Sequence, residues 1–322
     1  MLERLLILSW FLVFSSLANA QSPTYPTKPV KMIVPWAAGG TSDIGARVFA
    51  RKLSEGWNNQ VVIENRPGAG GTIGTAVAAK AAADGYTLLW ASNTEMFVGP
   101  HIYKDIPYQT LRDFVPVVYV SAQPLVLVVP PSLPVRTPQE LVAYAKSRPG
   151  ELNCSSAGNG SAMHLAQILF ERATGTKFVH VPYAGAPQAI AGNISGDAQL
   201  QFASLTAALE SIKSGRLRAL AVTSAKRSSA LPDLPTLAES GVPNSEFVIW
   251  NAVFAPQGTP PDVITKVYND VTRLLATSDV QEALSRLSME IVSMTRPQLD
   301  ALARSEWSSM AKLIAEAGVK VQ

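Results

Sequence analysis

The sequence contains few of the residues that most often build catalytic and metal sites. Among its 322 residues there are one cysteine, Cys154, and three histidines, His101, His164 and His180. A single cysteine excludes a framework of internal disulfides. The histidines are scattered, with no H-x-x-x-H motif and no Cys/His cluster of the kind that binds zinc. We therefore expect no metal site.

Charged residues are also scarce. They make up 16% of the chain, and the formal net charge is only +3. The sequence has no run of Lys and Arg and no interleaving of basic with aromatic residues, which argues against binding to nucleic acid. Hydrophobic residues account for 47%, a composition typical of a well-packed globular protein. The small positive charge suits a small acidic ligand.

The only long apolar run lies at the N-terminus. Arg4 precedes the apolar residues 5–17, and Ala18-Asn19-Ala20 matches an A-x-A cleavage site. The run is too short for a membrane span, which needs ~20 apolar residues. We predict that residues 1–20 are a signal peptide and that the mature protein is a soluble protein of the periplasm. Removing 20 of the 322 residues leaves 302, enough for two lobes.

Two segments have the pattern of an anion-binding strand–loop–helix connection. In the first, a strand at 30–34 is followed by Gly39 and Gly40, and Thr41, Ser42 and Asp43 offer helix N-caps. In the second, a strand at 152–156 leads through small residues to a helix that begins after Ser161. Free N–H groups and the positive end of the helix dipole favour an anion at such places.

Each loop alone is equally well explained as a tight connection between a strand and a helix. The presence of two such loops, one in each half of an exported chain, favours a ligand held between two lobes. Asp43 has two possible roles. It could cap its helix, which we favour, or it could accept a hydrogen bond from an amino or hydroxyl group of the ligand.

Strand-like and helical patterns alternate along the chain, which predicts an α/β fold with parallel sheets covered by helices. Two crossings between lobes are expected, at 121–124 and near 248, and two crossings make a hinge. Lobe 1 would comprise residues 21–121 and 248–322, and lobe 2 residues 122–247. The candidate strands are 30–34, 61–64, 87–91, 115–120, 125–129, 178–181, 200–202, 218–222 and 248–254.

The sequence gives little support to an enzyme. Residues 66–74 resemble a dinucleotide-binding loop, but Ile73 occupies the position of the third glycine. No G-x-S-x-G motif surrounds Ser155, Ser156 or Ser161. Cys154 at a strand end is expected to be buried and inert. We find no catalytic residues and expect no cofactor. An exported hydrolase acting on a small carboxylate ester or amide is the alternative.

A series of ordered motifs resembles a known family over essentially the whole mature chain. They occupy residues 25–29, 35–43 with Arg47, 62–71, 84–89, 156–161, 180–183, 217–224, 231–236, 241–243 and 255–261. The chain is similar to the Bug-type periplasmic solute-binding receptors of tripartite tricarboxylate transporters. The resemblance implies a type II-like periplasmic-binding-protein fold, with two α/β lobes around a cleft that closes on a small carboxylate. It also implies a non-enzymatic monomer that serves one large and one small integral-membrane transporter subunit.

The resemblance also implies which residues contact the ligand. Carried onto this chain, the ligand-binding residues of the first lobe are Gly39, Gly40, Thr41, Asp43, Ser92 and Asn93. Those of the second lobe are Ser156, Ala157, Gly158, Asn159, Gly160, Ser161, His164, Tyr183, Gly185 and Ser204.

Some positions depart from the family pattern. Ala184 stands where a Lys is frequent and Ala186 where a Ser is frequent, while Ala203-Ser204 replaces a common Asp-Asn. Trp36 replaces a smaller aromatic residue. These changes make one side of the cleft less polar, so we expect an aromatic or less polar monocarboxylate rather than a tricarboxylate.

Overall fold

The computed structural model describes residues 25–316. The expected signal peptide lies outside the described residues. Within them, no helix combines the length and the apolar character that crossing a membrane requires.

A mixed nine-stranded sheet organises the molecule, in the order β2-β1-β3-β9-β4-β7-β5-β6, with β8 also paired to β4. Strands β1, β2 and β3 are parallel to one another and form the sheet of the first half of the molecule. Strands β5, β6 and β7 are likewise parallel and belong to the second half, whereas β4 and β9 run antiparallel to their neighbours. The parallel sheets expected from the sequence are present in both halves, and the antiparallel pair β4 and β9 lies between them. The strands are β1 (Val30–Val34), β2 (Val61–Asn65), β3 (Thr87–Ser92), β4 (Phe114–Val129), β5 (Asn153–Ser156), β6 (Val179–Pro182), β7 (Leu200–Ser204), β8 (Arg218–Val222) and β9 (Val248–Pro256).

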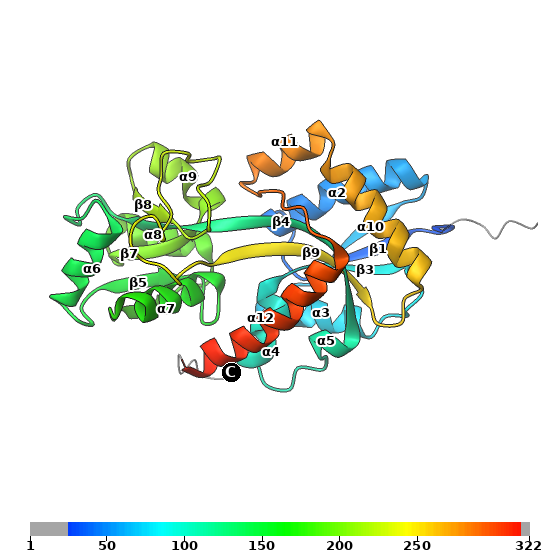
Figure 1. Ribbon diagram of the computed structural model, residues 1–322, viewed down its shortest axis with the longest axis horizontal. Coiled ribbons are helices and arrows are strands. Elements are labelled where there is room, and N and C mark those ends of the chain that lie inside the picture. The colour runs from blue at the N-terminus through cyan, green and yellow to red at the C-terminus, as the bar shows by residue number, and fades with distance from the viewer. Residues whose placement is uncertain (1–24, 317–322) are drawn as a thin grey trace, which may run out of the picture.

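Strands β4 and β9 join the two halves of the molecule (Figure 1). The sequence predicted two strands broken at 121–124, but β4 continues through this segment. There Ala122 pairs with Trp250 and Pro124 with Val248 of β9. Hydrogen bonds to β9 satisfy the backbone N–H and C=O groups of this segment, so β4 continues past the polar residue Ser121. Strand β4 passes through this segment without a loop, so no break in the strand marks where one lobe would end and the other begin. The lobe boundary near 121–122 therefore stays a prediction.

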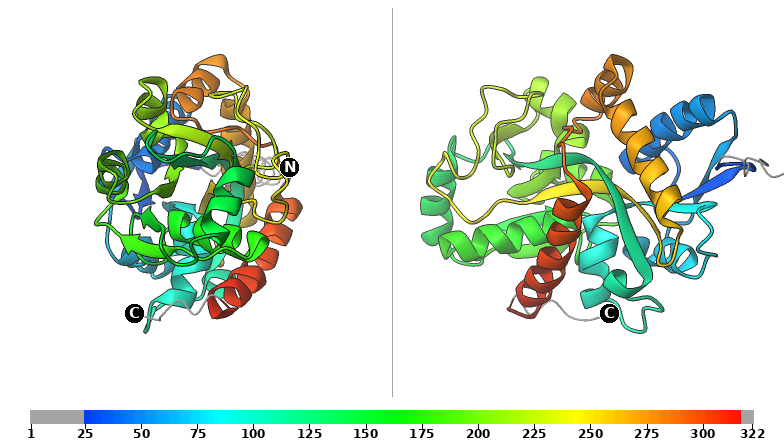
Figure 2. Two further views of the ribbon diagram at one scale, coloured as in Figure 1. Left: turned by 90° about the vertical axis from the view of Figure 1, so that its left-hand side faces the viewer. Right: turned by 45° about the vertical axis from the view of Figure 1, so that its right-hand side comes forward.

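Helices cover the sheet on both sides in each half, and α12 crosses from one half toward the other (Figures 1 and 2). Helix α2 begins after Gly40, which makes no side-chain cap. Thr41, Ser42 and Asp43 all lie inside its first turn, so none of them is the N-cap residue, although the Asp43 carboxylate still accepts from the N–H of Gly39 in the preceding loop. The helices are α2 (Thr41–Trp57), η2 (Ala69–Gly71), α3 (Thr72–Ala79), η3 (Thr94–Val98), α4 (Gly99–Ile102), α5 (Thr110–Asp113), α6 (Pro138–Lys146), α7 (Ala162–Thr174), α8 (Ala186–Ser195), α9 (Leu205–Lys213), α10 (Pro261–Leu275), α11 (Ser278–Arg286) and α12 (Arg296–Glu316).

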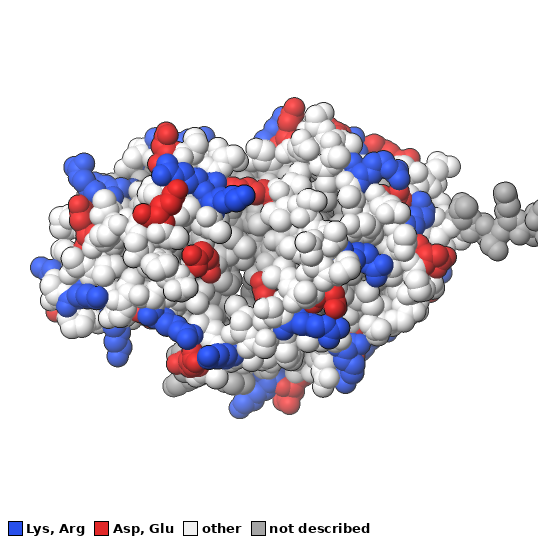
Figure 3. All heavy atoms as spheres, viewed as in Figure 1, with Lys and Arg blue, Asp and Glu red and all other residues white. Residues whose placement is uncertain are grey.

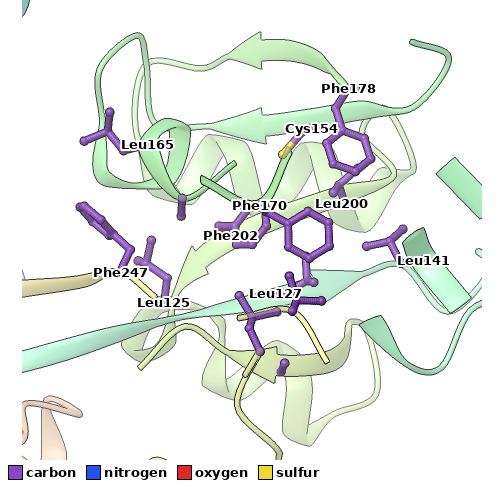
Figure 4. Close-up of a cluster of buried hydrophobic side chains, with 14 of the residues drawn as sticks. Leu125, Leu127, Leu141, Cys154, Leu165, Phe170, Phe178, Leu200, Phe202 and Phe247 are labelled. Carbon is purple, nitrogen blue, oxygen red and sulfur yellow. The ribbon is translucent and has the colours of Figure 1, made fainter. Parts of the chain in front are cut away.

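Each half has its own apolar core. In the second half, Phe170 of α7 and Phe202 of β7 pack with Leu127 of β4 (Figure 4). Cys154 lies in the same core, fully buried as expected, and burial raises the pKa of its thiol. In the first half, α2 and α10 pack against the sheet with amphipathic faces. On the face shown in Figure 3, acidic and basic side chains are interspersed without a large patch of one sign.

Candidate functional site

A cavity of about 710 Å³ has walls from both halves of the molecule. It lies at the carboxyl ends of β1, β3, β5 and β7, where ligands bind in open α/β sheets. Residues of the crossing strands also line it, namely Gln123 on β4 and Ile249 and Asn251 on β9. The cavity is therefore bounded by both sets of parallel strands and by the strands that join them.

Four helices begin at this cavity. The first residues of α2, α7 and α8, which are Thr41, Ala162 and Ala186, line its wall, as does the residue before α9, Ser204. Ser161 caps α7, with its side chain accepting from the N–H of His164. Helix starts bring free N–H groups and positive dipole ends to one place, which favours a negatively charged ligand group.

The cavity wall has no formal charge of its own. Among the described residues that line it, none is Asp, Glu, Lys, Arg or His. Apolar side chains form much of the remaining wall, including Val98, Ile102, Met163 and Met289. The arrangement suits a molecule with an anionic end, held by backbone and hydroxyl groups, and an apolar body.

The structure brings nine of the sixteen predicted ligand-binding residues to the cavity wall: Gly40, Thr41, Ser92, Ala157, Gly158, Asn159, Gly160, Ser161 and Ser204. The other seven are not among the lining residues: Gly39, Asp43, Asn93, Ser156, His164, Tyr183 and Gly185. Tyr183 and Gly185 lie in the turn before α8, where the Tyr183 N–H donates to the backbone oxygen of Ser156 and Gly185 precedes the first residue of the helix. The ligand contacts themselves stay a prediction.

Asp43 supports the first loop from behind. Its side chain is almost fully buried, and it accepts hydrogen bonds from the Gly39 N–H at 2.8 Å, Arg47 Nε at 2.9 Å and Asn65 Nδ2 at 2.9 Å. Burial alone would raise the pKa of this carboxyl group, but these hydrogen bonds and the Arg47 charge lower it. The carboxylate thus reaches back from the first helical turn to the loop, as an acidic residue in a capping box does.

Ser92 and its neighbours connect the end of β3 to the other elements of the site. Asn93 Nδ2 donates to the backbone oxygen of Val248 at 3.0 Å, and its Oδ1 accepts from the Trp250 N–H at 3.3 Å. These bonds tie the end of β3 to β9 where that strand crosses between the halves. Glu95, two residues further on, is fully buried and accepts from the Ser92 N–H at 2.6 Å.

Two stacked histidines support the second loop. The rings of His164 and His180 are parallel within 3°, with centroids 3.7 Å apart. His164 Nδ1 accepts from the Gly160 N–H at 3.1 Å, and His180 Nε2 is 2.6 Å from Ser156 Oγ. Burial, together with the charge of the other ring, lowers the pKa of His164 to about 4, and burial lowers that of His180.

The Ser156–His180 contact resembles part of a nucleophile–base pair, but its surroundings differ from those of a hydrolase. Ser156 is fully buried and outside the cavity wall, and its hydroxyl accepts from the Gly158 N–H at 3.1 Å. Within residues 25–316, no Asp or Glu forms a hydrogen bond to either histidine ring. The serine therefore stabilises its own loop.

Most of the apolar residues that line the cavity, and the buried residues behind them such as Glu95, were not predicted from the sequence. Gln123 and Asn251 had a signal that could have been used, because each is a polar residue inside an apolar strand. Glu95, within the buried segment Glu95 to Val98, had a similar signal. Other lining residues come together only by long-range packing, such as Ile102 of α4 and Met289 after α11.

Comparison with known proteins identifies the family. Residues 45–319 match the receptors of the tripartite tricarboxylate transporter family. The chain belongs to this receptor family. It is 39% identical to protein BugT of Bordetella pertussis, over 95% of this chain and 94% of the relative.

Solved structures give the same result. The R. palustris protein Rpa4515, solved with adipate, is 34% identical, with a TM-score of 0.82 over 92% of this chain and 99% of the other. MatC from Rhodopseudomonas palustris, with bound malate, is 27% identical, with a TM-score of 0.77 over 90% of this chain and all of the other. The predicted resemblance and the periplasmic-binding-protein fold are thereby confirmed.

The Asn93 contacts predict a structural role for this residue. Asn93→Ala leaves the partly buried carbonyl of Val248 and the buried N–H of Trp250 without these partners, so the free energy of unfolding should fall by about 1–3 kcal/mol. Urea denaturation without ligand measures the change. The exposed Asn269 of α10 offers a matched control, because Asn269→Ala should leave stability nearly unchanged. Equal midpoints for the two variants would contradict a supporting role for Asn93.

The histidine pair predicts a loss of stability in acid. Both pKa values are lowered in the folded state, so the neutral rings contribute stability that is fully present above pH 6.5 and is lost as the pH falls toward about 4. His164→Asn keeps an acceptor for the Gly160 N–H but cannot titrate. Urea midpoints between pH 7.5 and 4.5 should fall less steeply for this variant than for the wild type, and parallel curves would refute the assignment.

Proposed function

We propose that the chain is a periplasmic receptor that binds one small carboxylate in the cavity and passes it to the integral-membrane subunits of its transporter, one large and one small. The observation that carries the proposal is that four helices begin at one uncharged cavity, with α2 in the first half and α7, α8 and α9 in the second. The family and the adipate and malate found in related structures support it. The motif at residues 1–20 supports export, and the receptor acts as a monomer.

The proposed ligand has one carboxylate and a weakly polar or aromatic body. Backbone N–H groups at the helix starts and the hydroxyls of Thr41, Ser161 and Ser204 would receive the carboxylate, and the apolar wall would take the rest. A tricarboxylate would bring two further charges into a wall without a basic side chain, and burying an unpaired charge is costly. Trp36 and Tyr103 supply aromatic surface for a planar ligand.

Closure around the ligand forms part of the proposal. Gly160 of the second half lies so close to Ile102 of the first half that a methyl group added at Gly160 would overlap Ile102 Cδ1. A carboxylate that contacts loops from both halves gains its full set of hydrogen bonds only when the halves are together. Binding should therefore depend on how closely these two residues can approach.

A panel of carboxylates tests the binding function. Benzoate, adipate, malate and citrate are added to the mature protein, and thermal unfolding is followed together with mass spectrometry of each compound. A true ligand at 100 times its Kd should add ~2.7 kcal/mol of stability and be recovered unchanged. We expect benzoate, which has one carboxylate, to stabilise more than the dicarboxylates and citrate to stabilise least. Conversion to product would support the hydrolase alternative, and no stabilisation by any carboxylate would overturn the receptor proposal.

Substitution of Gly160 tests closure. Gly160→Ala should weaken binding tenfold or more, because the new methyl group meets Ile102 and holds the halves apart. It should also lower stability, since φ at Gly160 is +70°. Gly215 has nearly the same φ, +73°, with open space around it, so Gly215→Ala should lower stability without changing affinity.

A second substitution separates the clash from the backbone strain. Ile102→Val removes the overlapping Cδ1 atom, and the double variant with Gly160→Ala should recover most of the lost affinity. The affinity for the best carboxylate of the panel is measured by isothermal titration for the wild type, Gly160→Ala, Ile102→Val and the double variant. Failure of the double variant to recover any affinity would mean that this contact does not control closure.

A further inference from the structure

A buried carboxyl group, that of Glu95, lies directly behind the cavity wall. Two residues that line the cavity, Ser92 and Trp36, both form hydrogen bonds to it. Glu95 is fully buried, and no basic side chain bonds to it among the described residues. An acid in this position needs an explanation, because the adjoining cavity is suited to an anion.

The hydrogen bonds around Glu95 distinguish its two oxygens. Oε1 accepts from the Ser92 N–H at 2.6 Å and from Trp36 Nε1 at 3.2 Å, so it is an acceptor in either protonation state. Oε2 is 2.5 Å from Ser92 Oγ. The same Oγ accepts from the Thr94 N–H at 3.3 Å. A proton on Glu95 therefore belongs on Oε2, facing Ser92.

The direction of the Oε2–Oγ hydrogen bond decides what Ser92 offers to a ligand. When Glu95 is ionised, the single hydroxyl proton of Ser92 is used on Oε2, and only a lone pair faces the cavity. That lone pair repels a carboxylate. When Glu95 is protonated, its own O–H donates to Ser92 Oγ, and the serine proton is free to turn toward a ligand oxygen.

The surroundings of Glu95 favour the neutral acid. Burial raises the pKa of Glu95 to about 7, although the hydrogen bonds from Ser92 and Trp36 oppose this rise. The Tyr108 hydroxyl donates to the backbone oxygen of Glu95 at 2.7 Å. Of the elements packed against η3, β3, η2 and α3 contain no Asp, Glu, Lys, Arg or His.

The remaining titratable groups come from two helices that pack against η3. His101 lies on α4, and burial lowers its pKa. Glu306 on α12 accepts from Trp250 Nε1 at 2.7 Å. The other charged residues of α12 are half-buried or exposed: Arg296, Asp300, Arg304, Lys312 and Glu316. None of these residues forms a hydrogen bond to the Glu95 carboxyl group.

We propose that Glu95 takes up one proton from solvent when the carboxylate binds, which turns Ser92 from an acceptor into a donor toward it. The proton from solvent binds to Oε2 of Glu95. The Ser92 hydroxyl keeps its own proton on Oγ and turns its hydrogen bond from Oε2 to an oxygen of the ligand. Anion and proton therefore enter the site together, and the net charge of the site does not change. The inference rests on the proposed function and makes Glu95 a positioning residue of the same site.

Proton uptake and affinity are measured together by isothermal titration at pH 6.5, 7.5 and 8.5, in phosphate and in Tris. The probe is benzoate or adipate, whichever gives the larger melting shift. Because these buffers differ in ionisation enthalpy, the difference in heat gives the number of protons bound. At pH 8.5 we expect uptake of close to one proton, with affinity falling about tenfold per pH unit above 7. The carboxylates themselves stay ionised over this range.

Glu95→Gln distinguishes the proton from the shape of the side chain. Glutamine keeps an acceptor for Ser92 N–H and Trp36, and its Nε2 donates to Ser92 Oγ as the protonated acid does. The variant should therefore bind with little pH dependence and no proton uptake at pH 8.5. At that pH it should bind tenfold or more tightly than the wild type. A merely structural role would give weaker binding at every pH.

Glu306→Gln is the matched control. Burial raises the pKa of this carboxyl group to about 7 as well, but Glu306 accepts a hydrogen bond from Trp250, which does not line the cavity. This variant should keep the wild-type pH dependence and proton uptake. Binding without proton uptake, or the same pH dependence in Glu95→Gln as in the wild type, would overturn the inference. Absence of binding at every pH would instead overturn the proposed function.

Discussion

The antiparallel pairing of β4 with β9 is the constraint on which the rest of the structure depends. The two strands are hydrogen-bonded from Phe114 to Pro124 on one side and from Val248 to Pro256 on the other. Each half of the sheet is built outward from this pair, through β3 in one direction and β7 in the other. The helix starts of both halves therefore meet at the crossing, and polar Gln123 and Asn251 of the crossing strands line the cavity.

The site is made mainly from backbone and hydroxyl groups, and its two nearby acids are held in different ways. The Asp43 carboxylate is ionised because it accepts hydrogen bonds from Arg47, Asn65 and the Gly39 N–H, which lower its pKa. Glu95 has only neutral partners, so burial dominates and its pKa rises. An anion site can hence include two acids without strong repulsion, one screened by a cation and the other close to neutral.

The sequence was sufficient for the features that depend on local patterns. Gly40 and residues 157–161 lie in loops between a strand and a helix, and their position at the cavity follows from the rule that strand ends share an edge. The continuous β4 could not be predicted, because the segment 121–124 is polar and contains Pro124, and only its pairing with β9 keeps it extended. Ile102 and Met289 are similarly placed by contacts between distant segments.

Helix α12 adds a third link between the halves and limits how they can move. Leu299 and Ala303 belong to a core of the first half, whereas Leu313 and Ile314 belong to the core that includes Phe170 and Phe202. A helix of 21 residues is roughly 30 Å long and does not stretch. Moving the halves apart along α12 would break one of these apolar contacts. The exposed Arg172–Glu316 ion pair adds little to them. The proposed closure can therefore keep both contacts only as a rotation about an axis close to α12 and the paired strands β4 and β9. The largest displacement then falls on the side of the molecule farthest from α12.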